Sequence, residues 1–230
     1  MGKLVSQKTQ WAVVSQELEA ENIKVAYYDN VLIPLLGNLD GKKILDYGGG
    51  PGILAIALKK LGADVKVWDI SPDMRKLAGE KIGSENVYDK LTEIPKNNFD
   101  FIICNLVLCI NPENEVKSIV KNIKNFLKAD GRAFIGFCNP LIFDIPESRI
   151  DIRMQTGKRY EENHQYKKIK KEGNYKIIED HRPIEWYEKV YRESGLRLVN
   201  KHFTPEYAFK NRKIKDFAIF ELRKQRGYHA

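Results

Sequence analysis

An acidic residue followed by a run of glycines is the first feature of this sequence that could carry chemistry. The run D-Y-G-G-G-P-G begins at Asp46 and contains Gly48, Gly49, Gly50 and Gly52. So few side chains let the backbone approach a ligand closely. The G-x-G-x-x-G spacing of dinucleotide sites fails because Ile53 stands at its last position. A carboxylate here would repel a pyrophosphate but would suit a cationic amine or sulfonium.

A second acidic residue ends the next strand-like run. Asp69 follows Val65–Trp68, and a carboxylate at the end of a second strand can accept hydrogen bonds from both hydroxyls of a ribose. Asp46 and Asp69 would then lie at the carboxyl ends of consecutive strands. Together they predict a site for a nucleoside that carries a positively charged tail.

Strand-like apolar runs alternate with amphipathic helical runs around these residues, which predicts a parallel sheet with right-handed crossovers. Ser71-Pro72 has the N-cap and first-turn residues of a helix. Apolar residues at helical spacing from Val116 to Leu127 predict the clearest helix, which Asp130-Gly131 would end. The expected strands are residues 43–46, 65–68, 99–104 and 132–138, with a short one near 86–88, and a further helix is expected at 51–61.

The two ends of the chain and one long segment complete the expected organisation. Residues 9–36 have helical spacing in pieces, interrupted by Pro34. Residues 139–182 are rich in Tyr, Lys and Glu, and we expect a hairpin there around Lys171-Glu172-Gly173-Asn174. A helix at 183–194 and two strands at 196–203 and 216–222 follow, so an antiparallel pair would finish the sheet.

These runs together resemble the successive motifs of class I S-adenosylmethionine (SAM)-dependent methyltransferases. The resemblance rests on Ile44–Gly52, on Val65–Ser71 and on Phe99–Leu106, and it extends over about residues 40 to 222. It implies an α/β fold with a seven-stranded, mostly parallel Rossmann-like sheet, an antiparallel last strand, an N-terminal helical lid and an inserted hairpin.

One methyltransferase domain over residues 1–230 would then have four parts. They are N-terminal helices (1–40), a SAM-binding core (41–138), a substrate-side insertion (139–182), and a closing helix with a strand pair (183–230).

The resemblance also implies roles for individual residues. Asp46 and the four glycines would lie near the methionine part of SAM, Asp69 would hold the ribose, and Ile70 would pack on the adenine. Asp89 falls where the family often has an acidic contact to the adenine amine, although the residues around it depart from the family's usual acidic-leucine-proline motif. Asn105 and Leu106 would border the methionine part and the methyl acceptor.

Methyl transfer from a sulfonium is an in-line displacement, so alignment and exclusion of water can supply most of the catalysis. A general base helps when the acceptor is a phenol or a protonated amine, and His181, which leaves the insertion just before a helix, is the candidate. Tyr27 and Tyr28 on the N-terminal helix and Tyr160 in the insertion are candidates for the acceptor side. Each tyrosine could instead belong to the core or stabilise the hairpin.

The composition is that of an ordinary globular protein, with 43% hydrophobic and 30% charged residues among 230. Without an apolar run long enough for a membrane span or a signal sequence, we expect a cytoplasmic protein that uses no membrane and is a monomer or homodimer. Cys104, Cys109 and Cys138 have no metal-ligand spacing and are interpreted as buried thiols, so no metal is expected.

A net charge of +8 could attract anionic partners, and residues 201–226 hold eight Lys or Arg against three Asp or Glu. A solvated basic face is nevertheless favoured over a nucleic-acid site. We therefore expect SAM-dependent methylation of an O or N atom of a small molecule, with S-adenosylhomocysteine as the product. Alternatives are an RNA or protein methyltransferase that uses the basic C-terminal face, a non-catalytic SAM-binding module, and, less favoured, a nicotinamide-dependent oxidoreductase.

Overall fold

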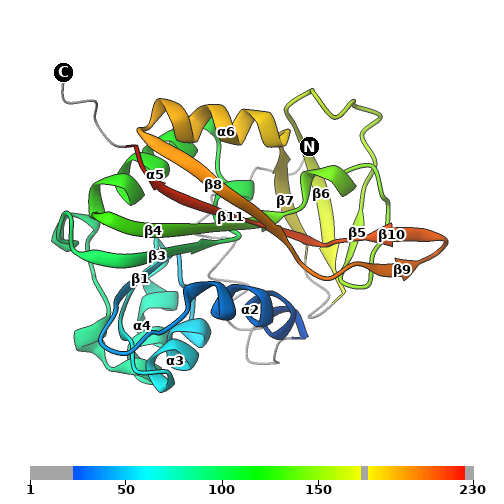
Figure 1. Cartoon of the computed structure of the whole chain (residues 1–230). Helices are drawn as coiled ribbons and strands as arrows, with labels where there is room; N and C mark the ends of the chain where they lie inside the picture. Colours follow the sequence, from blue (N-terminus) through cyan, green and yellow to red (C-terminus); the bar gives the residue numbers. More distant parts are fainter. Residues whose placement is uncertain (1–22, 172–175, 226–230) are drawn as a thin grey trace.

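A computed structural model describes residues 23–171 and 176–225, with the side chains of 23–27 outside that description. It contains a central six-stranded sheet in the order β2-β1-β3-β4-β11-β8 (Figure 1). The strands are β1 (Lys43–Tyr47), β2 (Asp64–Trp68), β3 (Phe99–Asn105), β4 (Leu127–Cys138), β8 (Leu196–Phe203) and β11 (Phe217–Lys224).

The first four of these strands in the chain are parallel, and β11 is antiparallel to both β4 and β8. The crossover between β1 and β2 is the helix α3 (Ile53–Lys60), and α4 (Pro72–Ile82) follows β2. α4 begins as the sequence predicts, because the Ser71 hydroxyl accepts a hydrogen bond from the Met74 amide at 3.4 Å. The predicted α/β fold with a final antiparallel pair is confirmed.

Helices cover both faces of the sheet. α5 (Glu113–Phe126) and α6 (Ile184–Glu193) lie on one face, whereas α2 (Ile23–Leu36), α3 and α4 lie on the other (Figure 1). Each face of the sheet has its own hydrophobic core, one under α5 and α6 and the other under α2, α3 and α4. Successive residues of a strand point to opposite faces, so β3 places Ile102 and Cys104 in the core under α5 and α6, and Phe101 and Ile103 in the other. The two cores hold the sheet rigid, and its carboxyl edge can therefore position side chains accurately.

Within the described residues the sheet has six strands rather than the seven expected. Where a further strand was expected near residues 86–88, only Val87 pairs, in a single parallel bridge to Val67. The neighbouring Asn86 and Asp89 are polar, and 84–86 and 91–93 form short 3-10 turns, so no apolar run extends the pairing. The helix α5 also ends earlier than expected, at Phe126, because Leu127 already pairs with Phe99 in the sheet.

The insertion forms a small sheet of its own beyond the carboxyl end of β4 (Figure 1). Its strands β6 (His164–Lys170) and β7 (Lys176–His181) are the expected antiparallel pair, although residues 172–175 between them lie outside the described part of the chain. The sequence reading missed β5 (Asp151–Arg153), which pairs with β6, and the short pair β9 (Tyr207–Phe209) and β10 (Arg212–Ile214). Three residues are too few to show an alternating pattern.

The N-terminal prediction is tested only in part. α2 contains Pro34 in its last turn, which agrees with the helical spacing expected up to residue 36. An expected helix before residue 23 would lie outside the described residues. Among the helices that the structure describes, none is both long enough and apolar enough to cross a membrane.

Candidate active site

The glycine turn connects β1 to α3 and is fixed by backbone hydrogen bonds. The Gly48 amide donates to the Trp68 carbonyl oxygen at 2.7 Å, and the Gly52 amide donates to the Gly49 carbonyl oxygen at 3.1 Å. Gly48, Gly50 and Gly52 all have positive φ. Such a backbone favours glycine, which explains why this turn carries so few side chains.

Asp69 joins the end of β2 to this turn. One of its carboxylate oxygens accepts the Gly50 amide at 2.9 Å, and the other accepts the Ser71 amide at 2.8 Å. Burial raises the pKa of Asp69, whereas these hydrogen bonds and nearby Arg75 lower it. Each carboxylate oxygen retains a second lone pair for a further donor.

Asp46 is the more unusual carboxylate of the two. It is 2% exposed, and its Oδ2 has no hydrogen-bond partner among the described residues. Burial, helped by the charges of Asp29 and Asp69, raises the pKa of Asp46 to about 7. Asp29, on α2, has its own pKa raised to about 7 by burial. A buried carboxylate oxygen without a donor is costly, so this position suits a cationic ligand.

Open space lies next to Gly50. A Cβ atom there would meet no heavy atom within 4 Å, whereas a Cβ on Gly49 would lie 2.7 Å from the Asp46 Cγ. Ile70 has 40% of its surface exposed although it is a large apolar residue. An open glycine, an unpaired carboxylate oxygen and an exposed apolar side chain are thus found at the ends of β1 and β2.

Asp89 lies apart from this arrangement. Its carboxylate pairs with the Arg75 guanidinium at 3.0 Å, and 73% of its side chain is exposed. Arg75 also donates to the Asp69 carbonyl oxygen at 2.9 Å, so it connects Asp89 to the end of β2. An adenine contact by Asp89 stays a prediction.

Asn105 ends β3 and meets the N-terminal helix. The Tyr28 hydroxyl donates a short hydrogen bond to the Asn105 Oδ1 atom, and the Tyr28 ring is buried against Phe217 and Gly136. Leu106, which follows, has φ of 58°, an uncommon backbone for a residue with a side chain. The structure therefore places Tyr28 beside Asn105, the residue expected to border the methionine part, whereas the Tyr27 side chain lies outside the described part of the chain.

The acceptor-side candidates His181 and Tyr160 contact each other. The His181 Nε2 lies 2.8 Å from the Tyr160 carbonyl oxygen, and burial lowers the His181 pKa. The Tyr160 hydroxyl accepts the Ile184 amide at 2.8 Å and donates to Glu185 at 3.2 Å. Tyr160 thus fixes the start of α6, which accounts for its position without a ligand.

His181 also lines a small pocket of about 10 Å³, with room for a single water-sized molecule. The pocket lies between the carboxyl end of β4 and the inserted sheet. It also contains Tyr166, for which the sequence left open a place in the acceptor pocket or a cross-strand pair in the hairpin, and groups that the sequence did not indicate for this site, namely Cys109, Cys138, Glu179, Asp180 and Arg182. Only the tertiary structure brings residues 109, 138 and 179 together, so no local pattern could have identified them.

Comparison with known proteins identifies the family to which the chain belongs. A family model described as a methyltransferase domain matches residues 20–177, so the chain belongs to that family. A solved SAM-dependent methyltransferase from Mesorhizobium loti superimposes with a TM-score of 0.66, at 15% identity, over 88% of this chain and 100% of its own. The fold is therefore that of the class I SAM-dependent methyltransferases, as the sequence predicted, and SAM is the cofactor of these enzymes.

Two further proteins are similar. An uncharacterized methyltransferase of Staphylococcus carnosus is 29% identical over 125 residues, which are 54% of this chain and 60% of that protein. A Burkholderia thailandensis 1,6-didemethyltoxoflavin-N1-methyltransferase, solved with 1,6-didemethyltoxoflavin and S-adenosylhomocysteine, superimposes with a TM-score of 0.55 at 15% identity, over 98% of this chain and 93% of its own. The chain spans about half the length of the curated relatives that it matches.

The residues present fit SAM. The unpartnered Asp46 oxygen suits the cationic amino-acid end, the Asp69 carboxylate can accept from the ribose, and Ile70 offers an apolar surface to a base. The open side of Gly50 leaves room for close approach.

Proposed function

We propose that this protein transfers the methyl group of SAM to an O or N atom of a small molecule. The observation that carries the proposal is the buried, unpartnered Asp46 oxygen beside the open Gly50, next to Asp69. In this proposal, residues 41–138 bind the cofactor and residues 139–182 contribute the acceptor pocket.

The cofactor would supply an electrophilic methyl group on a sulfonium. Asp46 would attract the ammonium of its amino-acid end, and Asp69 would orient the ribose through its carboxylate. Both residues are positioned by β1 and β2 and by the Gly50–Asp69 hydrogen bond, so the cofactor site is largely preorganised. Preorganisation favours the collinear geometry that displacement requires.

The position of the small pocket at the end of β4, rather than its volume, supports an acceptor site beside the cofactor. Gly136 pairs with Asn105 in the sheet, and Cys138, two residues further along β4, lines the pocket. The acceptor side is thus adjacent to the predicted methionine site. His181, uncharged at neutral pH because burial lowers its pKa, could accept a proton from an acceptor O–H or N–H. The small-molecule target of the Burkholderia structure agrees with this reading.

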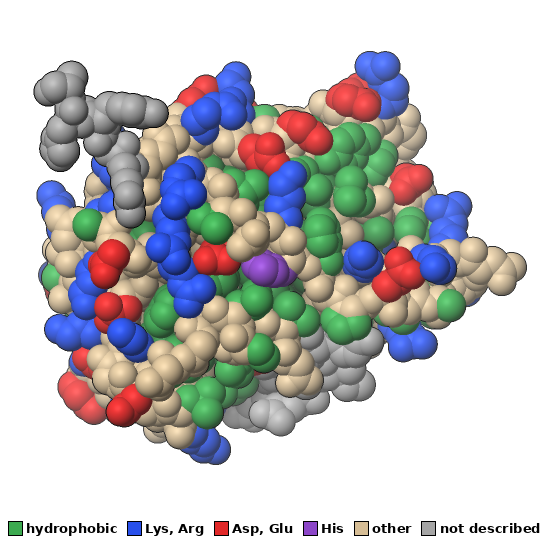
Figure 2. Space-filling view, viewed as in Figure 1, with side chains coloured by type: hydrophobic (Ala, Val, Ile, Leu, Met, Phe, Trp, Pro, Cys, Tyr) green, Lys and Arg blue, Asp and Glu red, His purple; other side chains and the backbone are tan. Residues whose placement is uncertain are grey.

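The alternative of an RNA or protein target rests on the basic C-terminal face. Figure 2 shows basic side chains spread over one face of the molecule, with acidic ones among them. Several of the basic residues are paired with carboxylates, as in Lys201 with Glu188 and Lys213 with Glu206. Such pairing reduces the positive potential available to a polyanion, and so the small-molecule acceptor is favoured.

The test is transfer of labelled methyl from SAM to separated fractions of a cell extract. We expect label in the small-molecule fraction, none in the protein or RNA fractions, and its loss in the Asp46→Asn variant. Label in the macromolecular fraction, with a steep salt dependence, would support the alternative instead. A protein that binds S-adenosylhomocysteine but labels no fraction would be a binding module.

A further inference from the structure

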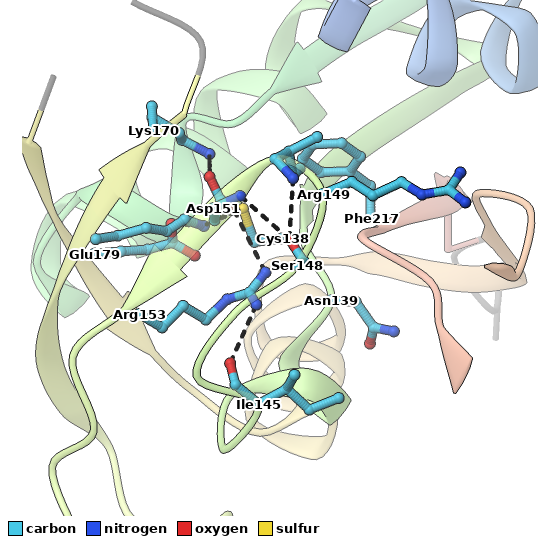
Figure 3. A network of polar contacts seen from close by, with 12 residues as sticks. Cys138, Asn139, Ile145, Ser148, Arg149, Asp151, Arg153, Lys170, Glu179 and Phe217 are labelled. Carbon is cyan, nitrogen blue, oxygen red and sulfur yellow. Dashed lines mark hydrogen bonds and ion pairs between the residues drawn. The ribbon is translucent and has the colours of Figure 1, made fainter. Parts of the chain in front are cut away.

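A buried charged cluster lies between β4 and the inserted sheet, and its central cation is Lys168. The ammonium of Lys168 lies 2.6 Å from Glu179 Oε2, 3.1 Å from Asp151 Oδ2 and 2.9 Å from the Cys138 sulfur. Lys168 is fully buried, yet its pKa is raised, because these neighbours outweigh the effect of burial. Figure 3 shows this region, in which Cys138 points from the end of β4 toward Asp151 and Glu179.

Cys109 completes the cluster on the side of Cys138. It lies in the 3-10 turn η3 (Leu108–Ile110) after β3, and the two sulfurs are within 4.8 Å of each other. A hydrogen bond from the Cys109 thiol, together with the Lys168 and Lys170 ammonium groups, lowers the pKa of Cys138 against the effects of burial and of Glu179. Cys104, which is also buried, differs from Cys138 because burial and the charge of Asp46 raise its pKa.

The two sulfurs and Glu179 could also suggest a metal site, since their ligand atoms lie close together. The Lys168 ammonium, however, already contacts both Glu179 and Cys138. A metal ion would have to displace this buried cation, so the arrangement favours thiolate chemistry over metal binding.

We propose that Cys138 is an oxidant-sensitive thiolate that forms a reversible disulfide with Cys109. A small, partly open pocket lined by both cysteines offers hydrogen peroxide, which is one oxygen atom larger than water, an approach to the sulfur. The residue that reacts and the residue that resolves are thus side by side, and Lys168 stabilises the anionic form. This modification site does not depend on the identity of the methyl acceptor.

The chemistry balances with hydrogen peroxide as oxidant. The Cys138 thiolate attacks one peroxide oxygen, so an S–O bond forms, the O–O bond breaks and hydroxide leaves. The Cys109 sulfur then attacks the Cys138 sulfur while its own S–H bond breaks: an S–S bond forms, the S–O bond of Cys138 breaks, and the oxygen takes the Cys109 proton and leaves as water. The sulfurs must close to about 2.05 Å, which a shift of the short turn η3 can supply.

The experiment is peroxide treatment of the whole protein followed by mass spectrometry of the intact chain and its peptides. We expect the loss of two hydrogen atoms, a peptide linking Cys109 to Cys138, and full reversal by dithiothreitol. In Cys109→Ser, Cys138 should instead gain oxygen atoms, whereas Cys104→Ser should behave as the wild type. A wild-type chain that shows no linked peptide, or in which Cys104 oxidises as fast as Cys138, would overturn the proposal.

The role of Lys168 is tested by the pH dependence of the oxidation rate. In the wild type, the oxidation rate should reach its plateau at a pH below about 8.5, which is the ordinary pKa of a thiol. In Lys168→Met the profile should move to higher pH, and Lys168→Arg should restore it in part because it keeps the cation. Circular dichroism checks folding, and the wild-type profile alone decides the matter if the variants do not fold. A wild-type rate that still rises above the ordinary thiol pKa would contradict a stabilised thiolate.

Discussion

The Gly50 amide donates a hydrogen bond of 2.9 Å to the Asp69 carboxylate, and this contact joins the loop after β1 to the end of β2. The same carboxylate caps the start of the next segment through the Ser71 amide. Asp69 therefore has a structural task in addition to its proposed contact with ribose. A substitution of Asp69 therefore removes the hydrogen bonds to Gly50 and Ser71 as well as the proposed ribose contact.

Replacement of Asp69 by Ala should weaken S-adenosylhomocysteine binding by at least ~10-fold, because a lost charge-assisted hydrogen bond costs about 1.5–3 kcal/mol. Calorimetric titration measures this. The affinity of Asp69→Asn should lie between those of the wild type and Asp69→Ala, since its amide oxygen can still accept one of the two backbone hydrogen bonds. Asp73→Ala, an exposed carboxylate in the first turn of α4, is the matched control and should bind as the wild type.

Replacement of Asp46 should have opposite effects on the stability of the fold and on cofactor binding. Its folded pKa of about 7 lies above the unfolded value of 3.8, so its protonated form stabilises the fold at low pH and this contribution is lost as pH rises through about 7. Asp46→Asn should therefore raise the unfolding free energy at pH 8 by about 1–3 kcal/mol, while it weakens cofactor binding. Thermal unfolding and calorimetry on the same samples measure the two quantities.

The pH dependence of the wild type is a consequence of the same group. Affinity for S-adenosylhomocysteine should increase as pH rises through about 7, because the ammonium prefers the ionised carboxylate. Asp46→Asn should remove most of this dependence. If the wild-type affinity is flat between pH 6 and 8, Asp46 is not the group that meets the ammonium.

Gly50→Ala should reduce cofactor affinity more than it reduces stability. The new methyl group meets no protein atom, so the folded protein bears only the strain of φ +54°, about 1–2 kcal/mol. It would, however, occupy the space proposed for the cofactor. Gly41→Ala is the matched control, because it has a similar φ of +64° and equal space but precedes β1, away from the carboxyl edge. Equal loss of affinity in both variants would contradict this location of the cofactor.

The cofactor half of the site was predictable because its signal is local. Asp46, the glycines and Asp69 lie at the ends of two short strands, and strand order in a parallel sheet brings such ends to one edge. The short segment around Val87 was less predictable, since one bridge to Val67 takes the place of a strand. Pairing there depends on the neighbour rather than on an apolar run.

The acceptor half was only partly predictable. The sequence indicated a polar insertion and its hairpin, but buried charges such as Lys168 and Asp151 look like ordinary surface residues in a linear pattern. Their burial is stabilised by ion pairs between strands β5 and β6, which form only once the register of the sheet is set. Asp89 is the opposite case. It was selected by its position in the family's motif, and in the structure its exposed carboxylate pairs with Arg75.

Tyr28 and Gly136 should be energetically coupled, which a double-mutant cycle can measure. A Cβ atom on Gly136 would overlap the Tyr28 phenol, so Gly136→Ala should destabilise the protein by about 1–3 kcal/mol through overpacking. In a Tyr28→Ala background the same change should cost under about 1 kcal/mol, because the ring is gone. Urea unfolding of the four proteins gives the coupling energy. Additive effects would mean that α2 does not pack on β4 in solution, and the Tyr28–Asn105 hydrogen bond would then be lost with it.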